Sequence, residues 1–356
     1  MTRFSVEGEG WEHPVLVGAL AEAGAELAGL SDGRRLPLVT DEQVWALHGA
    51  RIAALAEVEP LFVPAGEAAK TWDTLHALLE RFHALGVTRD TPVIAFGGGS
   101  VGDLAGLAAS LFKRGCPVVH IPTTLLAQVD SAVGGKTAID AFGHKNLMGT
   151  FHPPALVVAD IGLLATLDPR QLRAGYAEVV KYGLIGDAEF FAWCEAHGGD
   201  LLAGDDQARS YAVDYCLHAK AAAVSRDLHD RTGRRALLNF GHTFAHAIEA
   251  AAGLGVVLHG EAVAIGLVLA FELSAELGLC SAGDAQRVRA HFVAAGLPTR
   301  LADFAVAGPG LLPLMLADKK AGAGAPVLIL ARGIGQAFVS RDVTADQLAA
   351  FLGRTA

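Results

Sequence analysis

Short hydrophobic runs alternate with helical patterns from the N-terminus to about residue 165. Residues 41–57 and 70–85 carry hydrophobic positions at helical spacing and fill gaps between the runs. This alternation predicts βα units, and runs this short and apolar are typical of parallel strands covered on both faces. We therefore expect a Rossmann-like parallel sheet that binds ligands at the carboxyl ends of its strands. The predicted strands are PVLVG, LPLVTD, PLFVPAG, TPVIAFGGGS, PVVHIPTT and PALVVAD.

The hydrophobic pattern changes near residue 170. Asp168 and Pro169 are start signals for a helix, and helical patterns dominate from about Asp187 to the end. One late run, APVLILARGIG, is strand-like and is expected to pair with QAFVS as a small hairpin. The sequence thus predicts an α/β domain over residues 1–170 and a mostly α-helical domain over residues 171–356.

The composition fits a folded two-domain protein. A chain of 356 residues is too long for one typical core, and 52% hydrophobic with 19% charged residues excludes a disordered chain. A net charge of -10 disfavours nucleic acid and anionic membranes as partners. The N-terminus shows no apolar signal segment, and the longest apolar run, Ala262–Phe271, is about half a membrane span. We expect a cytoplasmic protein whose four scattered cysteines are reduced thiols.

Three histidines lie within the stretch from Arg235 to Glu261. His242 and His246 are four residues apart on a predicted helix, so both rings project from one face, and His259 follows a Gly-containing break. Three protein ligands with one open position are typical of catalytic zinc, so we expect a metal site that lacks only a carboxylate. The alternative is a set of helix histidines satisfied by hydrogen bonds at the edge of the core.

A glycine-rich turn is the strongest signal in the first domain. One predicted strand passes through Gly97, Gly98 and Gly99 into a helix that begins near Val101, which suits the pyrophosphate of a dinucleotide. The turn is not the GxGxxG fingerprint, and a plain turn is the alternative. Two further loops after predicted strands carry groups that suit phosphate and ribose: Gly66, Glu67 and Lys70, and Thr123, Thr124 and Asp130.

Several other charged groups fit an anionic ligand. A Gly-rich segment carries Lys136, Lys145 and Asn146, which suggests a phosphate-binding site. Solvated surface lysines would give the same pattern. Glu178 and Lys181 are three apart on the helix that begins near Pro169, and apolar neighbours favour a buried pair. Other candidate cations are Lys220, on a helical stretch, and Lys319 and Lys320, on a charged tip.

Together these motifs resemble the 3-dehydroquinate synthase family of sugar phosphate cyclases over nearly the whole chain. The matching segments, in the family's order, are PAGEAAK, GGGSVGDLAG, FKRG, IPTTLLAQVDSAVGGKTAID, KNLMGTFHPP, GYAEVVKYGLI, RALLNFGHTFAHAIE and LHGEAVAIG. Several motifs in one order are far more specific than any single glycine loop.

The resemblance assigns expected roles to individual residues. It implies zinc or cobalt bound by Glu178, His242 and His259, so that His246 leaves the metal shell. It implies that Arg114 reaches the substrate phosphate across the interface of a homodimer, and that Lys319 or Lys320 reaches the substrate. Expected NAD-binding residues are Glu67, Lys70, Gly99, Ser100, Val101, Gly102, Asp103, Thr123, Thr124, Lys136, Lys145 and Thr166. Expected substrate contacts are Lys136, Asn146, Lys181, Lys220, Arg235, Asn239, His246 and Asp130.

The resemblance also implies a reaction on 3-deoxy-D-arabino-heptulosonate 7-phosphate. Enzyme-bound NAD+ removes hydride from a hydroxyl that the metal acidifies, phosphate leaves by β-elimination, and the hydride returns. Ring opening and an intramolecular aldol closure then give 3-dehydroquinate. Some positions depart from the family's usual pattern, and none removes an expected ligand or catalytic group. They are Gln171 for Glu, His144 for Gly, Pro154 for Gln, Ala245 for Gly, and LHD at 228–230 for an acidic sequence.

Other functions remain as alternatives. Cyclases of sedoheptulose 7-phosphate or glucose 6-phosphate act on substrates without a carboxylate and have no reason to keep Arg235, Lys220 and Asn239 together. An amino-dehydroquinate synthase fits the same residues. A metal-dependent polyol dehydrogenase would release NADH and would not need the phosphate-binding residues. A catalytically inactive NAD-binding protein would not need the metal ligands.

Overall fold

The computed structural model describes every residue except 32, 226, 229–234, 254, 318–326 and 356. The chain divides into two compact units, Met1–Asp168 with Arg209–His229, and Pro169–Ala208 with Asp230–Ala356. The expected break near residue 170 thus has a counterpart after Asp168, but one later segment groups with the first unit. This segment belongs to helix α7 (Asp206–Val224), which packs there through a stacked Phe4–His218 pair with ring centroids 4.0 Å apart.

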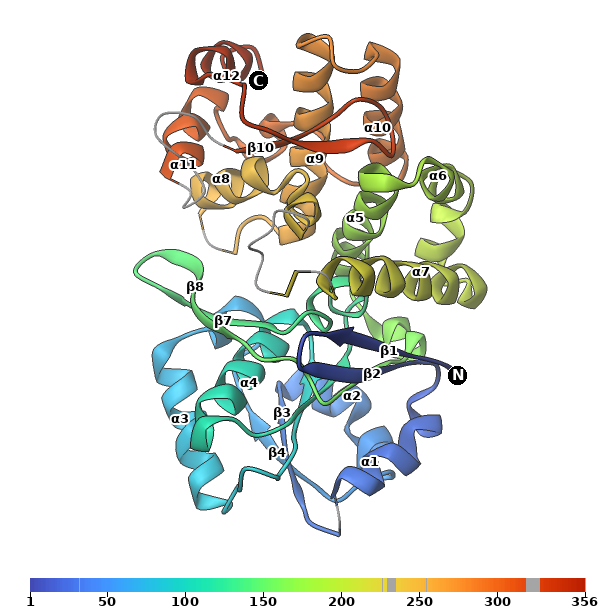
Figure 1. Cartoon of the computed structure of the whole chain (residues 1–356), viewed down its shortest axis with the longest axis vertical. Coiled ribbons are helices and arrows are strands. Elements are labelled where there is room, and N and C mark those ends of the chain that lie inside the picture. The colour runs from blue at the N-terminus through green and yellow to red at the C-terminus, as the bar shows by residue number, and fades with distance from the viewer. Residues whose placement is uncertain (32, 226, 229–234, 254, 318–326, 356) are drawn as a thin grey trace. The chain divides into compact units, whose positions relative to one another are not determined.

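The first unit contains a seven-stranded sheet with the order β1-β2-β9-β6-β5-β3-β4 (Figure 1). β1 and β2 are antiparallel, and all the other neighbouring pairs are parallel. All six predicted strands are confirmed. β1 was not predicted, because it is an edge strand with mainly polar, exposed positions. The strands are β1 (Thr2–Gly8), β2 (Trp11–Val17), β3 (Leu36–Thr40), β4 (Val58–Phe62), β5 (Val93–Gly97), β6 (Val118–Pro122) and β9 (Leu156–Ala159).

Alternate residues of the central strands enter two separate hydrophobic cores, one on each face of the sheet. On β5, Val93 and Ala95 pack with Leu78 and Phe82 of α3 and with α4. Ile94 and Phe96 point to the opposite face. There they pack in a core that also includes residues of α1 and α2, so helices cover both faces (Figure 1). The helices are α1 (Gly24–Ser31), α2 (Glu42–Ala53), α3 (Trp72–Ala84) and α4 (Gly99–Leu111).

A second, two-stranded sheet follows β6 in the chain. β7 (Lys136–Ala141) and β8 (His144–Phe151) form an antiparallel hairpin in the segment that we expected to be a Gly-rich loop. The strands were missed because no position of β8 is fully buried and the pairing is irregular near the turn. The backbone here is therefore more ordered than the glycine content suggests, and it carries Lys136, Lys145 and Asn146.

The second unit is mostly helical, as expected. α9 is buried along most of its length and contacts α5, α8 and α10. The predicted late hairpin is confirmed as β10 (Leu328–Ala331) paired with β11 (Ala337–Ser340). Among the described residues, no helix is both long and apolar enough to cross a membrane. The helices are α5 (Pro169–Gly186), α6 (Ala188–Ala203), α8 (His242–Ala252), α9 (His259–Glu276), α10 (Ala282–Ala294), α11 (Leu311–Ala317) and α12 (Ala345–Leu352).

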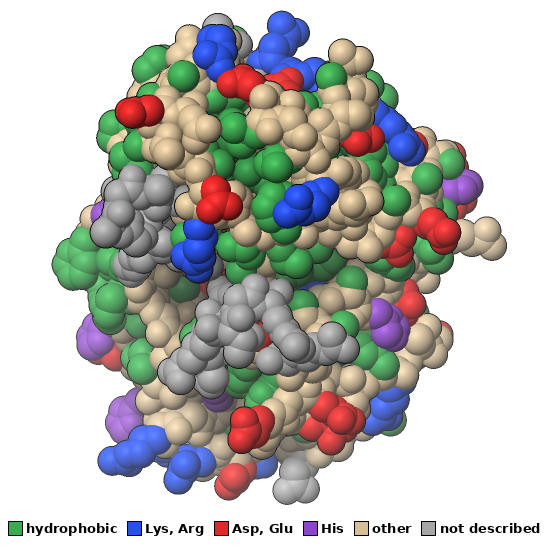
Figure 2. All heavy atoms as spheres, turned by 45° about the horizontal axis from the view of Figure 1, so that its top comes forward, with side chains coloured by type: hydrophobic (Ala, Val, Ile, Leu, Met, Phe, Trp, Pro, Cys, Tyr) green, Lys and Arg blue, Asp and Glu red, His purple; other side chains and the backbone are tan. Residues whose placement is uncertain are grey.

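Side chains of both charge signs are interspersed on the face drawn in Figure 2. Hydrophobic side chains lie between them across the described part of this face. A surface that binds nucleic acid usually shows a continuous positively charged area. The described part of the face in Figure 2 shows no such area.

Candidate functional site

The glycine-rich turn lies at the carboxyl end of β5. β5 ends at Gly97 and α4 begins at Gly99, with Gly98 between them as the N-cap residue. A Cβ on Gly98 would lie 3.1 Å from Thr124 Cγ2, and one on Gly99 would lie 3.0 Å from Ser131 Oγ. Packing this close leaves little room for side chains and keeps the first N–H groups of α4 accessible to an anion. The structure thus places the turn where a dinucleotide phosphate was expected.

Lys70 is the centre of a polar network beside this turn. Its side chain is 2% exposed, and its Nζ lies 2.7 Å from Asp103 Oδ2 on α4 and 3.9 Å from Glu67 Oε2. It also donates a short hydrogen bond to Asn146 Oδ1 on β8. Ser100 Oγ donates to Glu67 Oε1 at 3.0 Å, which links the network to the first turn of α4. Expected cofactor residues from two segments, the loop with Glu67 and Lys70 and the start of α4, are therefore in direct contact. Asn146 of β8, expected at the substrate, joins them.

Burial alone would lower the pKa of the Lys70 ammonium. The neighbouring carboxylates of Asp103 and Glu67 outweigh this effect, so the pKa of Lys70 is raised above its ordinary value. Lys70 therefore remains charged at neutral pH, although it is almost completely shielded from water. A fixed cation beside a helix N-terminus is suited to a phosphate group.

A π-helical turn carries Asp130 next to the same edge of the sheet. The turn spans Ala127–Ser131, and Thr124 Oγ1 accepts a hydrogen bond from Ala127 N at 3.2 Å just before it. Lys220 Nζ on α7 donates short hydrogen bonds to both the carboxylate and the backbone carbonyl of Asp130. π-helical turns are rare and are frequent at functional sites. Two residues 90 positions apart in the sequence, both expected at the substrate, therefore form one pair.

The remaining expected cofactor residues of the first unit lie in three places. Thr123 follows a strand end, Lys136 and Lys145 lie on the β7–β8 hairpin, and Thr166 ends the 3-10 helix Ile161–Thr166. Thr166 Oγ1 is 2.8 Å from His48 Nε2 of α2, a partner that the sequence did not suggest. Thr123 directly follows the end of β6, and its N–H donates to Gly97 O at the end of β5 at 2.9 Å. Lys136 is exposed at the start of β7, and Lys145 is half-buried on β8.

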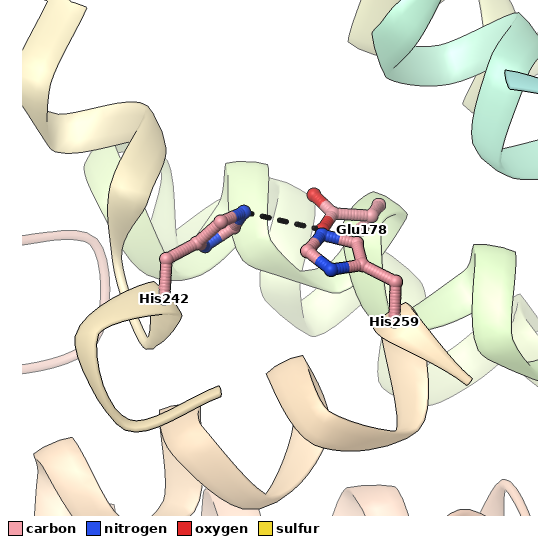
Figure 3. A group of neighbouring side chains, drawn as sticks. All are labelled: Glu178, His242 and His259. Atoms are coloured by element: carbon pink, nitrogen blue, oxygen red, sulfur yellow. Dashed lines mark ion pairs between the residues drawn. The ribbon is translucent and has the colours of Figure 1, made fainter. Parts of the chain in front are cut away.

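In the second unit, Glu178, His242 and His259 bring one ligand atom each into a group whose members all lie within 4.8 Å of one another (Figure 3). Glu178 Oε1 is 3.7 Å from His242 Nε2 and 3.5 Å from His259 Nε2. The three come from α5, α8 and α9. A carboxylate and two imidazoles match the ligand set of a catalytic zinc site. His246 is outside this group, so three histidines alone do not describe the site.

Two close helix contacts produce this geometry. A Cβ on Gly260 would lie 1.8 Å from the carbonyl oxygen of Ala174, so only glycine lets the start of α9 reach α5. A Cβ on Gly266 would lie 2.2 Å from the carbonyl oxygen of Gly241, where α8 begins. Glycines on α9 therefore bring the helix that carries His259 against those that carry Glu178 and His242.

Contacts around the three ligands orient them. His242 Nδ1 is 3.1 Å from the backbone oxygen of Phe240, and His259 Nδ1 is 3.5 Å from Glu249 Oε2. Both histidines are thereby fixed with Nε2 toward Glu178. Lys181 Nζ lies 2.5 Å from Glu178 Oε2, and both of these side chains are fully buried. Outer-shell partners of this kind are typical of metal-ligating histidines.

The electrostatics of the group also fit a cation. Burial lowers the pKa of His242 to about 3, so its ring is neutral and able to ligate. Burial acts in the same direction on His259, but Glu178 and Glu249 outweigh it and raise its pKa to about 10. A metal ion would take the place of this proton, because a ligating imidazole must be neutral. The residues present therefore fit a divalent metal.

Other expected substrate residues of the second unit take different positions. Arg235 is 3% exposed and begins a short 3-10 helix that ends at Asn239, just before α8. His246 lies on α8 and is exposed, with its ring centroid 5.6 Å from that of His242. Lys181 is the buried partner of Glu178. Lys319 and Lys320 fall outside the described residues.

Arg114 is exposed in a strained turn of the first unit. Lys113 and Arg114 have φ values of 49° and 68°, and Gly115 follows at 115°. Left-handed backbone at two successive residues with side chains is uncommon and costs energy, and such strain collects at functional positions. Arg114 is exposed on this turn.

An ion pair at the start of α9 was not predicted from the sequence. Arg170 forms a bidentate pair with Glu261, with distances of 2.6 and 2.8 Å. Glu261 also accepts a hydrogen bond from Leu258 N, which caps α9 one residue before His259. Glu249 was missed as well, although it lies seven residues after His242 and therefore on the same face of α8. That spacing was the signal that could have identified it.

Comparisons with known proteins agree with this geometry. Residues 60–174 match the family model of the 3-dehydroquinate synthase N-terminal part, and residues 175–321 match the C-terminal part. The chain is 49% identical to a 3-dehydroquinate synthase of Jannaschia sp. strain CCS1, with 98% of this chain and 97% of the relative covered. It is 51% identical to that of Paracoccus denitrificans, with 92% and 91% covered.

Solved structures of sugar phosphate cyclases share the fold. A 2-epi-5-epi-valiolone synthase from Streptomyces hygroscopicus, with NAD+ and Zn2+ bound, superposes with a TM-score of 0.87 at 36% identity, covering 96% of this chain and 95% of that one. A 2-deoxy-scyllo-inosose synthase in complex with carbaglucose-6-phosphate, NAD+ and Co2+ has a TM-score of 0.84 at 26% identity over both full chains. The family models and the curated relatives together show that this chain belongs to the 3-dehydroquinate synthase family.

Proposed function

We propose that this chain converts 3-deoxy-D-arabino-heptulosonate 7-phosphate to 3-dehydroquinate and inorganic phosphate, with NAD and Zn2+ or Co2+ as cofactors. Family membership supports the reaction class. The observation that carries the proposal is the group of Glu178, His242 and His259, whose ligand atoms converge within 4.8 Å. The product places the enzyme in the shikimate pathway, which leads to the aromatic amino acids.

The metal would be held by Glu178, His242 and His259. When bound, it supplies a Lewis acid that makes a substrate hydroxyl more acidic. Glu249 and the carbonyl of Phe240 keep both imidazoles in the orientation that ligation needs. Lys181 and Glu178 are fully buried, so Lys181 neutralises part of the negative charge of Glu178, and it would offer a cation next to the reacting hydroxyls.

The dinucleotide would occupy the carboxyl end of the parallel sheet, with its phosphates at the N-terminus of α4. When bound, NAD+ supplies a hydride acceptor that is regenerated within the same turnover. Lys70, held by Asp103 and Glu67, provides a fixed cation there. Ser100 ties Glu67 to the first turn of α4. The remaining NAD contacts in this proposal are Gly99, Val101, Gly102, Thr123, Thr124, Lys136, Lys145 and Thr166.

Positively charged and amide side chains would hold the anionic ends of the substrate. Lys136, Asn146, Lys181 and His246 are assigned to the phosphate and nearby hydroxyls. Arg235, Lys220 and Asn239 are assigned to the carboxylate and ring hydroxyls. The shielding of Arg235 and Lys220 from water strengthens their attraction for a carboxylate, because Coulomb interactions grow as the local dielectric falls. Asp130 would accept a hydrogen bond from a substrate hydroxyl, with Lys220 fixing its direction.

Assembly and location are further parts of the proposal. We propose a homodimer in which Arg114 of one subunit completes the phosphate site of the other; the exposure of Arg114 on a strained turn supports this. We also propose that the enzyme works in the cytoplasm, where a biosynthetic sugar phosphate and NAD are available. Its partners are then the substrate and a second copy of itself.

The test is release of inorganic phosphate from the heptulosonate phosphate by purified protein supplied with NAD+ and Zn2+. We expect stoichiometric phosphate and 3-dehydroquinate without net NADH. Net NADH accumulation, with no phosphate, would instead identify a polyol dehydrogenase. Parallel reactions with sedoheptulose 7-phosphate, glucose 6-phosphate and the amino analogue identify the other cyclase activities, and inactivity towards every substrate contradicts the proposal.

A further inference from the structure

An irregular pairing lies within the β7–β8 hairpin. Ile139 pairs with Met148 and Ala141 pairs with His144, so Asp140 alone lies opposite three residues of β8. Extra residues on one strand break the ladder and leave backbone groups without their usual partner. The middle one of the three is Asn146. Bulges of this kind re-aim a side chain.

Asn146 has a left-handed backbone with φ 53°. Its N–H donates a hydrogen bond to Asp140 Oδ1 at 2.8 Å, so the Asp140 carboxylate takes the place of the missing ladder partner. Asparagine tolerates the left-handed region better than most residues with a side chain, but the conformation still needs support from its surroundings. Asp140 supplies that support from the opposite strand.

The side chain that this conformation presents is the one that contacts Lys70. Asn146 Oδ1 accepts from Lys70 Nζ, and Lys70 Nζ also lies 2.7 Å from Asp103. Asp140 reaches Lys70 by a second route, because its backbone N–H donates to Lys70 O at 2.9 Å. The hairpin and the loop before α3 are therefore tied together on both sides of the same lysine.

We propose that Asp140 is a positioning residue for the cofactor site, holding Asn146 so that its amide and the Lys70 ammonium keep the geometry that binds NAD+. This inference rests on the proposed NAD-dependent function and adds a residue that contacts neither the glycine-rich turn nor the metal ligands in the described structure. Asp140 acts through Asn146 and does not itself touch the reacting atoms.

The variants Asp140→Ala and Asp140→Asn separate position from charge. Alanine removes the acceptor for the Asn146 N–H, whereas asparagine keeps an acceptor oxygen and loses only the charge. We expect Asp140→Ala to weaken NAD+ binding about tenfold, as for loss of a hydrogen bond to a charged group. Asp140→Asn should stay within about twofold of the unmodified protein. His144→Ala is the matched control, because this exposed residue lies on the same hairpin and makes no described side-chain contact with Lys70 or Asn146.

A double-mutant cycle tests whether the effect passes through Asn146. Asn146→Gly removes the side chain and keeps a backbone that accepts positive φ without strain. In this background, Asp140→Ala should produce no further loss of NAD+ affinity. An equal tenfold loss in both backgrounds would show that Asp140 acts independently of Asn146 and would overturn the inference.

Amide hydrogen exchange of residues 136–151 in the protein without cofactor gives a second readout. The Asn146 amide should exchange faster in Asp140→Ala than in Asp140→Asn. Unchanged exchange in Asp140→Ala overturns the inference whether or not NAD+ binds. If the unmodified protein binds no NAD+, the proposed function fails. If it binds NAD+ and Asp140→Ala binds equally well, the positioning role alone fails.

Discussion

Lys220 donates hydrogen bonds to both the carboxylate and the backbone carbonyl of Asp130. The lysine side chain is 6% exposed and the aspartate side chain 19%, so both charges are largely removed from water. The pair joins α7 to the π-helical turn that follows β6. A residue from the later part of the sequence thus contacts the turn that follows β6, and its segment, Arg209–His229, groups with the first unit.

Replacing Lys220 by Met should destabilise the protein. The substitution leaves Asp130 largely buried without its ammonium, and loss of one partner from such a pair costs about 3 kcal/mol in the free energy of unfolding. Asp130→Asn added to Lys220→Met should recover part of this loss, because no unpaired charge then remains. Urea unfolding of the single and double variants measures both effects. Additive losses would show that the two residues do not act as a pair.

His242→Ala and His246→Ala should behave differently toward metal. His242 belongs to the group of converging ligand atoms, so its loss should abolish tight binding of Zn2+. His246 is outside the group, so its variant should keep the metal and lose turnover. Metal content after dialysis against a weak chelator, measured beside phosphate release, separates the two. Equal loss of metal from both variants would contradict the assignment of His246 to the substrate.

Glu249→Gln should weaken metal binding about tenfold, because it removes the carboxylate that orients His259 Nδ1. Glutamine keeps nearly the same shape, so the fold should remain intact. A competition titration with a chromophoric chelator measures the affinity, and the visible spectrum of the Co2+ form reports the ligand geometry. Glu272→Gln is a suitable control, since this carboxylate pairs with Arg289 and not with a metal ligand. An unchanged metal affinity for Glu249→Gln would remove its orienting role.

The protein should lose stability as the pH falls from about 6.5 to 4, partly because of His13 and His120. Both are buried, and burial lowers the pKa of each from 6.5 to about 4. Below pH 6.5 the unfolded chain takes up protons that the folded chain refuses, so the free energy of unfolding decreases until the folded pKa is reached. Each histidine contributes about 3 kcal/mol to this decrease, from roughly 2.5 units of pKa difference.

Urea unfolding of the unmodified protein and of His120→Gln between pH 8 and pH 4.5 measures this effect. The variant should show a shallower loss of stability below pH 6.5 and no difference in slope above pH 7. His76→Gln is the control for the substitution itself, because this histidine is exposed on α3 and lies outside the core. Parallel curves for His120→Gln and the unmodified protein would show that His120 does not titrate as described.

Local patterns in the sequence were sufficient to predict most of the helices and strands. The parallel strands carry apolar runs that only a sheet covered on both faces can bury, and the start of α5 is marked by Asp168 and Pro169. Two parts of the fold, β1 and the β7–β8 hairpin, were not predicted, and each has a physical reason. β1 is a polar edge strand, and β7–β8 is an irregular hairpin in which no position of β8 is fully buried, so β8 shows no repeating hydrophobic pattern.

The sequence by itself determined the residue types of the site and, through its ordered motifs, the family. It carried the glycines of the turn, the metal-binding side chains and the cations, because the chemistry of each is a property of its side chain. The family resemblance already implied that Glu178 replaces His246 in the metal set, and the tertiary structure shows the packing that brings the three ligands together. Spacing favoured His242, His246 and His259 as one set, whereas the close approach of α9 to α5 and α8 selects Glu178, His242 and His259.

The same applies to the pairs that no local pattern reveals. Lys220 with Asp130, and Lys70 with Asn146, are each more than 70 residues apart in the sequence. Asp140 gains its proposed importance only because a break in strand pairing leaves an N–H that it accepts. Side-chain chemistry is local and can be read along the chain, but contact between distant residues depends on backbone packing, and this arises only when the chain has folded.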